Sequence, residues 1–285
     1  MRTLSFYVKN EYDNRKVLHF LRGSAGLSAR LVRSLKQVDN GILLNDIPAR
    51  TVDTIRVGDK ITINIPEDEN IAHPTEYEID VLFEDEDIII VNKPAWLPMH
   101  ESHNHQGDTL ANAVSWHLAK QGKSSTFRAI GRLDKGTSGI VVCALNSFAA
   151  AKLSGQIKKQ YIAIATGVIK GKGTIDKPIY RPDPLKTLRA AGEIGERAVT
   201  NYEVIDGNCE MTMLKIKLDT GRTHQIRVHF SDMGHPLVGD RMYGEKHPKI
   251  ERQALHCGYA TIKHPILENE LEIYAPLPQD MEELL

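Results

Sequence analysis

Asp134 is the residue whose setting most favours chemistry. It lies in a polar, glycine-containing loop, residues 131–139 (GRLDKGTSG), that runs directly into the apolar segment of residues 140–145 (IVVCAL). Reactive groups are often carried on loops that a rigid scaffold holds in place, so this carboxylate is a candidate catalytic group. The alternative is an Asx-turn, in which the Asp134 side chain only caps its own backbone.

Residues 218–240 predict a turn followed by a helix. Thr223 can cap a helix that reads HQIRVHF. The free backbone amides at the start of this helix, with Arg222 beside them, would form a site for an anion.

Arg227 lies next to the apolar face of that predicted helix, because Ile226 and Phe230 are four residues apart. Its guanidinium is therefore expected to be partly buried, and a buried guanidinium needs an anionic partner. Asp134 would serve as that partner, and a structural ion pair elsewhere in the protein is the alternative.

Tyr161 stands near the start of a predicted strand, residues 158–167 (KKQYIAIATG), and shares one face with Ala163. From its position alone, Tyr161 is interpreted as half-buried packing.

The sequence indicates neither a metal nor a nucleotide cofactor. The histidines of residues 100–105 (HESHNH) lie in a loop without a matching set of further ligands. His224 and His229 are five residues apart, whereas metal ligands on one helix face are typically four apart. The phosphate-binding pattern GxxxxGK[ST] is absent, and residues 171–173 (GKG) are typical of a hairpin turn.

Composition predicts a soluble, cytoplasmic protein with a sizeable core. The 285 residues are 41% hydrophobic and 26% charged, close to the average for globular proteins. The three cysteines lie far apart without a CxxC spacing, which favours reduced thiols inside the cell. We find no run with the length of a signal sequence or a membrane span. A monomer is expected, because no extra apolar helix is evident.

Charge is distributed unevenly along the chain. Residues 1–65 contain 11 Lys/Arg and 6 Asp/Glu, a net charge of +5, whereas the remainder contains 25 and 31, a net charge of −6. A basic segment of this kind suggests contact with a polyanion.

Part of this basic charge follows one predicted helix. Ser28 can cap a helix over residues 29–38, whose leucines form an apolar seam. Arg30, Arg33 and Lys36 recur every three residues and form a neighbouring stripe, called the basic stripe below. It is either a solvated helix face or a nucleic-acid contact.

The elements that must hold these groups indicate an α+β fold. Residues 1–66 predict two helices followed by strands, residues 67–80 a linker, and residues 81–285 a larger domain in which strands dominate. Helices within the larger domain are predicted at residues 108–121 and 147–160. Strands joined by both short turns and longer crossovers favour a mixed sheet.

Taken in order, these segments resemble the RluA type of RNA pseudouridine synthase. The family's H-R-L-D-x-x-T-S-G loop is matched by residues 131–139, its K-x-Y strand by residues 159–161, and its T-G-R-x-H-Q-[LI]-R-V-H segment by residues 220–229. Its G-H-P-[IL]-x-G-D segment follows at residues 234–240. The resemblance covers about residues 80–280. It implies a mixed, mainly antiparallel sheet and an enzyme that isomerises uridines in RNA.

The first 66 residues resemble the S-four-type RNA-binding domain that often precedes this catalytic domain. Residues 27–30 (LSAR), 41–45 (GILLN) and 57–60 (VGDK) carry that resemblance. It implies that the basic stripe contacts RNA phosphates.

The resemblance also implies roles for individual residues. Asp134 would be the catalytic carboxylate, and Arg227 would keep it ionised and oriented. Tyr161 would pack on the target base and assist proton removal from carbon 5, while Arg132 would help displace the target nucleotide from its stack. The other residues expected to contact the substrate are Thr137, Arg222, His224, Gln225 and Ile226.

The implied reaction explains why so few groups are needed. The base leaves the ribose, rotates and is rejoined through carbon 5 with the exchange of one proton, so neither a redox cofactor nor ATP is required. Asp134 would act as a nucleophile or would remove a sugar proton so that a glycal forms, and both routes stay open.

Two positions depart from the family pattern. Gly131 stands where histidine is usual, and Trp96 stands where glycine is usual in the segment NKPAWL. The chemistry does not require that histidine, so altered substrate contacts are expected, not loss of activity.

The layout favours large-subunit ribosomal RNA over transfer RNA as the substrate, by analogy with relatives of the same layout. A non-catalytic RNA-binding protein that keeps the fold is an alternative, against which the presence of Asp134, Tyr161 and Arg227 speaks. A carboxylate hydrolase is another, but that chemistry uses two carboxylates at a defined separation.

Overall fold

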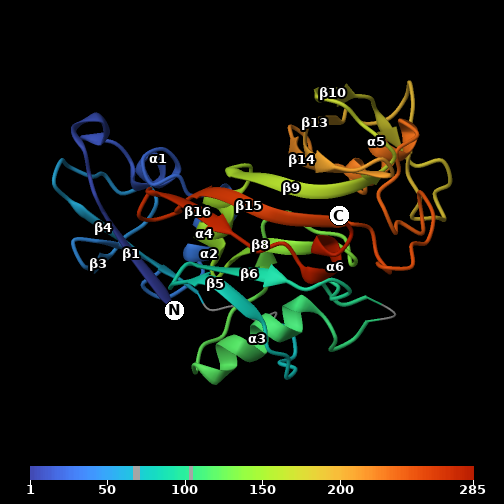
Figure 1. The fold of residues 1–285 in the computed structure, drawn as a ribbon. Helices are drawn as coiled ribbons and strands as arrows, with labels where there is room; N and C mark the ends of the chain where they lie inside the picture. The colour runs from blue at the N-terminus through green and yellow to red at the C-terminus, as the bar shows by residue number, and fades with distance from the viewer. Residues whose placement is uncertain (67–70, 103–104) are drawn as a thin grey trace.

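The computed structural model describes residues 1–66, 71–102 and 105–285. Within those ranges, ten strands form one sheet through the centre of the molecule (Figure 1). Eight of them follow the order β10-β13-β14-β9-β15-β8-β6-β5, with β16 paired to β15 and β7 paired to β8. The bounds are β5 Asp80–Glu84, β6 Ile88–Lys93, β7 Arg128–Ala129, β8 Ser138–Ala144, β9 Ile157–Thr166, β10 Lys172–Asp176, β13 Val199–Gly207, β14 Met211–Leu218, β15 Leu255–Lys263 and β16 Glu270–Tyr274.

The expected mixed, mainly antiparallel sheet is confirmed. β15 and β8 are parallel, with His256 opposite Ser138 and Cys257 opposite Gly139; the other pairs in this sheet are antiparallel. Gly139 permits this close approach, because its φ is 108° and a Cβ there would lie 2.3 Å from the Cys257 carbonyl oxygen. The loops that precede β8 and β15 are consequently neighbours.

The central strands are covered on both faces. Ile88 to Val91 of β6 and Ile140 to Cys143 of β8 are almost completely buried. Strands covered on both faces typically have continuous apolar sequences, not alternating apolar and polar residues, and these two strands follow that rule. Helix α3, Leu110–Lys120, lies beside β5 and β6 (Figure 1). Its first turn is closed by a capping box between Thr109 and Asn112.

The predicted helix over residues 147–160 is too long. Helix α4 spans Ser147–Leu153 and is capped by Asn146, whose side chain accepts a hydrogen bond from the amide of Ala149 at 2.8 Å. Ser154 leaves the helical conformation with φ −59° and ψ 118°, and Gly155 follows with φ 74°. The Gln156 amide donates to the Leu153 carbonyl at 3.0 Å to close this turn, and β9 begins at Ile157.

Residues 1–65 build a second, four-stranded sheet in the order β1-β4-β2-β3, at the left of Figure 1. Helices α1 and α2 pack on it, and together they enclose a separate apolar core. We call this part the N-terminal unit. Its elements are β1 Arg2–Tyr7, the 3-10 turn Asn10–Tyr12, α1 Val17–Arg22, α2 Ala29–Leu35, β2 Ile42–Leu44, β3 Ile47–Pro48 and β4 Lys60–Ile65.

The predicted cap of α2 is confirmed, because Ser28 Oγ accepts a hydrogen bond from the amide of Leu31 at 3.1 Å. The helix ends at Leu35, earlier than predicted. Gly41 packs against that end so closely that a Cβ there would lie 2.1 Å from the Leu35 carbonyl oxygen.

Part of the expected linker packs on the large domain. Residues 67–70 lie outside the described residues, but Ala72 and His73 accept hydrogen bonds through their carbonyls from Ser115 and Asn112 of α3, at 2.7 and 2.9 Å.

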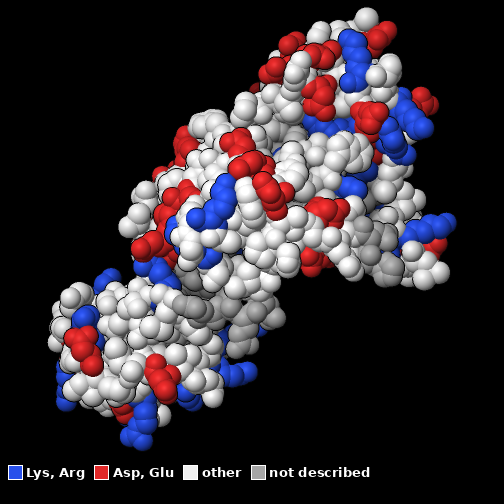
Figure 2. All heavy atoms as spheres, turned by 90° about the horizontal axis from the view of Figure 1, so that it is seen from below, with Lys and Arg blue, Asp and Glu red and all other residues white. Residues whose placement is uncertain are grey.

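Contacts made by α4 and by the turn before β6 join the N-terminal unit to the rest of the described chain. Phe148 of α4 is 2% exposed and belongs to the core of the N-terminal unit, where its ring centre lies 6.2 Å from that of Phe6. Arg2 donates to both oxygens of Asp87, at 2.9 and 2.7 Å. Figure 2 shows the resulting two-lobed shape, with Lys and Arg side chains around the edge of the smaller lobe.

Phe148→Ala is therefore expected to destabilise the protein by about 3–5 kcal/mol, the usual cost of removing a buried phenyl ring. Urea unfolding followed by circular dichroism measures this. Phe148→Leu is the control, because an apolar replacement of similar volume typically costs less than about 1.5 kcal/mol. Equal stability of the alanine variant and wild type would show that the ring does not hold the two parts together.

Candidate active site

The residues that the sequence singled out surround one cavity of about 510 Å³. The loop before β8, the start of β9 and the segment from β14 to α5 (Gln225–Asp232) form its walls. Chain segments far apart in sequence therefore meet there. Of the predicted site residues, those lining the cavity are Arg132, Asp134, Thr137, Tyr161, Arg222, His224, Gln225, Ile226 and Arg227.

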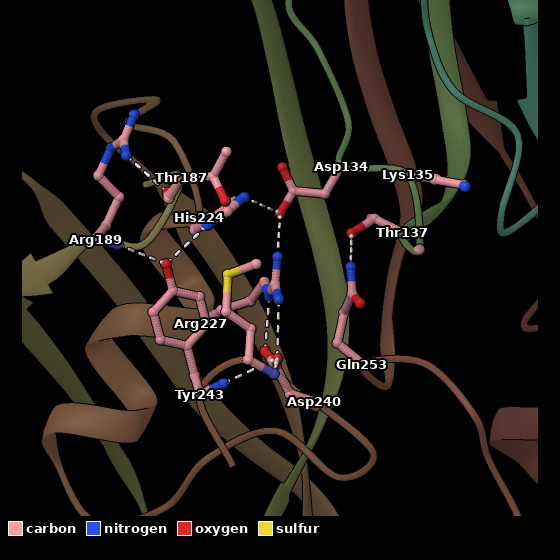
Figure 3. A network of polar contacts seen from close by, with 12 residues as sticks. Asp134, Lys135, Thr137, Thr187, Arg189, His224, Arg227, Asp240, Tyr243 and Gln253 are labelled. Carbon is pink, nitrogen blue, oxygen red and sulfur yellow. Dashed lines mark hydrogen bonds and ion pairs between the residues drawn. The ribbon is translucent and has the colours of Figure 1, made fainter. Parts of the chain in front are cut away.

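Asp134 and Arg227 form the ion pair that the sequence suggested. Arg227 Nη1 lies 3.1 Å from Asp134 Oδ2, with the Asp134 side chain 17% exposed and the Arg227 side chain 8% exposed (Figure 3). Little water reaches this pair, so its electrostatic attraction is stronger than at a free surface.

Asp240 is a member of this cluster that the sequence reasoning missed. Arg227 donates from Nε and Nη2 to the two Asp240 oxygens at 2.7 and 2.8 Å, and Asp240 is completely buried. This two-pronged contact fixes the plane of the guanidinium and leaves Nη1 directed at Asp134 (Figure 3). The signal available in the sequence was the end of the GHPLVGD segment, residues 234–240.

His224 approaches the same oxygen of Asp134 as Arg227 does. Its φ of 59° places it in the left-handed region ahead of α5, and its Nε2 lies 3.9 Å from Asp134 Oδ2. Its Nδ1 is 2.8 Å from the Tyr243 hydroxyl, which also accepts a hydrogen bond from the Arg189 amide. Burial lowers the pKa of His224, although Asp134 opposes this, so the imidazole is neutral at neutral pH.

The predicted cap and anion site before α5 are not formed as expected. His224, not Thr223, occupies the cap position, and no side chain caps the helix there. Gln225 instead closes the preceding turn, because its Oε1 accepts from the Arg222 amide and the Thr220 hydroxyl. The guanidinium of Arg222 is bound to Glu196.

Tyr161 lies on β9 and is 9% exposed. Burial raises the pKa of its phenol well above the ordinary value, and Cys257 and Asp134 add to that effect. The side chain is therefore protonated at neutral pH, which suits a ring that packs against a ligand.

Other predicted features lie apart from this cluster. In the basic stripe, Arg30 and Arg33 are exposed on α2 and Lys36 is exposed directly after that helix. His100 packs on Phe127, and His105 binds Asp108 at 2.6 Å, while His103 lies outside the described residues. The described residues contain no group of three or more side chains that could hold a metal.

The two departures from the family pattern both have left-handed backbones. Gly131 has φ 79° and open space where a side chain would lie. Trp96 has φ 69° and is 49% exposed, a conformation that glycine adopts more readily. The amide of Trp96 donates to the Lys135 carbonyl at 2.8 Å, so it supports the loop that carries Asp134.

Among the described residues, no helix has the length and apolar character needed to cross a membrane.

Comparisons with known proteins place the chain among relatives of one family. Residues 87–232 match the family described as RNA pseudouridylate synthase. The chain is 34% identical to a Bacillus subtilis protein named as the uncharacterized RNA pseudouridine synthase YjbO, over 273 residues, which cover 92% of this chain and 96% of that protein. It is 35% identical to ribosomal large subunit pseudouridine synthase D of Escherichia coli K12, covering 87% and 82%. Human RNA pseudouridylate synthase domain containing 1 superposes with a TM-score of 0.59 at 26% identity, covering 70% of this chain and 83% of that one.

Proposed function

The chain belongs to the RNA pseudouridylate synthase family, and from that premise we propose that it isomerises uridines in ribosomal RNA with Asp134 as the catalytic carboxylate. Relatives of this family convert uridine in RNA to pseudouridine. The observation that carries the proposal for Asp134 is its ion pair with Arg227 inside the cavity.

The cavity has what this isomerisation needs. Its volume of about 510 Å³ falls within the range of small-ligand sites, so a flipped-out nucleotide can be held apart from its RNA stack. Arg227 orients the Asp134 carboxylate through their 3.1 Å contact, so that it can attack the ribose or remove a sugar proton. Tyr161 supplies a ring against which the base can pack while it rotates.

Arg132 is exposed at the rim of this cavity. A guanidinium there can stack in the place that the target base vacates, which supports its assignment to nucleotide displacement.

Ribosomal RNA is favoured as the substrate because ribosomal large subunit pseudouridine synthases are among the relatives. We assign RNA binding to residues 1–66, a linker to residues 67–80 and the synthase domain to residues 81–285. The separate sheet and core of the N-terminal unit support that division.

Tritium release from RNA labelled at carbon 5 of uridine tests the function. Wild-type protein is expected to release tritium from unmodified large-subunit ribosomal RNA transcripts without forming free uracil, because the base stays attached. Free uracil would indicate a hydrolase. Binding without release from either ribosomal or transfer RNA would favour a non-catalytic RNA-binding protein.

Replacing the basic stripe, Arg30, Arg33 and Lys36, with alanine is expected to weaken RNA binding and flatten its salt dependence. Each lost phosphate contact should reduce the slope of log K against log salt by about 0.7–0.9. Filter binding of a ribosomal RNA transcript at several salt concentrations measures this. An unchanged slope would show that the exposed face of α2 does not contact RNA.

A further inference from the structure

The backbone that carries Asp134 is held partly by two side chains, Lys93 and Arg252, that do not line the active-site cavity. The Asp134 carbonyl accepts a hydrogen bond from the Thr137 amide at 3.0 Å, which closes a tight turn. The next two carbonyls bind buried cations: Lys135 O accepts from Lys93 Nζ at 3.2 Å, and Gly136 O accepts from Arg252 Nη1 at 3.2 Å. Two cations thus support consecutive peptide units of the turn.

Lys93 is fully buried, and backbone carbonyls bind its ammonium. Its Nζ donates to Pro94 O, Leu97 O and Lys135 O at 2.8, 3.0 and 3.2 Å, which uses all three of its hydrogens. Burial, with the Arg252 charge nearby, lowers the pKa of Lys93 to about 7. Of the two cations, Arg252 is therefore the one whose charge is permanent.

Arg252 is oriented by an acidic residue near the end of the chain. It is 2% exposed and donates from Nε and Nη2 to the two oxygens of Asp280, both at 2.7 Å. Asp280 lies in the short helix α6, Gln279–Glu282, and its side chain is 39% exposed. This paired contact fixes the guanidinium plane. Nη1 then meets the carbonyls of Gly136, Gln253 and Leu255 at 3.2, 3.3 and 3.2 Å, so Asp280 contributes to where Nη1 contacts Gly136.

We propose that Asp280 is a positioning residue for the isomerase, acting through Arg252 on the turn that presents Asp134 to the substrate. The proposal rests on the catalytic role proposed for Asp134. It makes α6 part of the active-site support, although Asp280 and Arg252 lie outside the cavity. Small displacements matter at such a site, because moving a reacting group by about 1 Å can cost about 100-fold in rate.

Asp280→Asn tests this with little change in shape, and Glu282→Gln is the matched control. Glu282 is exposed on the same helix and loses the same charge. Asp280→Asn is expected to lower kcat for tritium release by about 10-fold or more, with KM within about twofold of wild type. Glu282→Gln should match wild type in both constants. A kcat for Asp280→Asn within about twofold of wild type, or an equal loss in Glu282→Gln, overturns the proposal.

Arg252→Lys supplies a second test, because lysine keeps the charge but cannot make the two-pronged contact with Asp280. It should lose kcat as Asp280→Asn does, and wild-type activity in this variant would also overturn the proposal. All assays are run at a temperature where circular dichroism shows each variant to be fully folded.

Hydrogen exchange at the Thr137 amide separates this proposal from the proposed function. The amide is bound to the Asp134 carbonyl, so in Asp280→Asn it should exchange about 10-fold faster than in wild type, whereas Glu282→Gln leaves it unchanged. Absence of tritium release by wild type would refute the proposed function alone. Unchanged exchange in Asp280→Asn would refute the positioning role, whatever the activity.

Discussion

Asp134→Asn is expected to lower turnover by about 10⁴-fold or more, the scale of loss seen when a central catalytic group is removed. Asparagine has nearly the same shape, and its carbonyl can still accept a hydrogen bond from Arg227 Nη1, which lies 3.1 Å from Asp134 Oδ2. It can neither attack the ribose nor take up a proton. The loss should therefore appear in kcat, with the fold and the RNA affinity nearly intact.

Tritium release from ribosomal RNA measures the turnover of this variant, and filter binding measures its affinity. Asp206→Asn, an exposed carboxylate on β13, is the control for loss of one negative charge. Turnover of Asp134→Asn at the wild-type rate would remove Asp134 from the mechanism. A loss of RNA affinity equal to the loss of rate would make Asp134 a binding residue.

Arg227→Met is expected to abolish turnover and also to lower stability by about 3–5 kcal/mol, the cost of breaking a buried ion pair on one side. Asp240 is completely buried and loses its cationic partner, while Asp134 loses the contact that orients it. The loss of turnover and the loss of stability both come from the Arg227 side chain. A second substitution is therefore needed to separate the two effects.

The double variant that combines Arg227→Met with Asp240→Asn separates the effect on turnover from the effect on stability. Removing the buried negative charge should restore much of the stability, because replacing both partners of a buried pair is often close to neutral. Turnover should stay lost, since Asp134 is still without Arg227. Urea unfolding and tritium release measure the two effects, and recovery of activity in the double variant would contradict the role of Arg227.

The main features of the site were predictable because they follow from general physical needs. A guanidinium next to an apolar helix face requires an anion, and Asp134 in the loop before an apolar strand could supply it, although 93 residues separate the two. The cap of α2 followed from Ser28 alone. The family motifs predicted the mixed sheet and the RNA isomerase activity.

What was not predictable depends on contacts without a local pattern. The GHPLVGD segment marked Asp240 as a residue of interest, but its contact with Arg227, like that of Arg252 with Gly136, is evident only in the folded chain. The end of α4 was placed wrongly because residues 154–160 contain polar groups that suit helix or strand equally, and the turn at Ser154 and Gly155 ends the helix. Thr223 is a good capping residue type, but the left-handed His224 takes that position.

Trp96 gives the protein a built-in optical reporter. The chain has two tryptophans, and the other, Trp116, lies on α3 beneath the Lys120 ammonium. Trp116→Phe would leave one half-exposed indole whose backbone is bonded to the Lys135 carbonyl, next to Asp134. In stopped-flow time courses, its fluorescence would report RNA binding and a conformational change of the neighbouring turn. Neither a labelled RNA nor an attached dye would be needed.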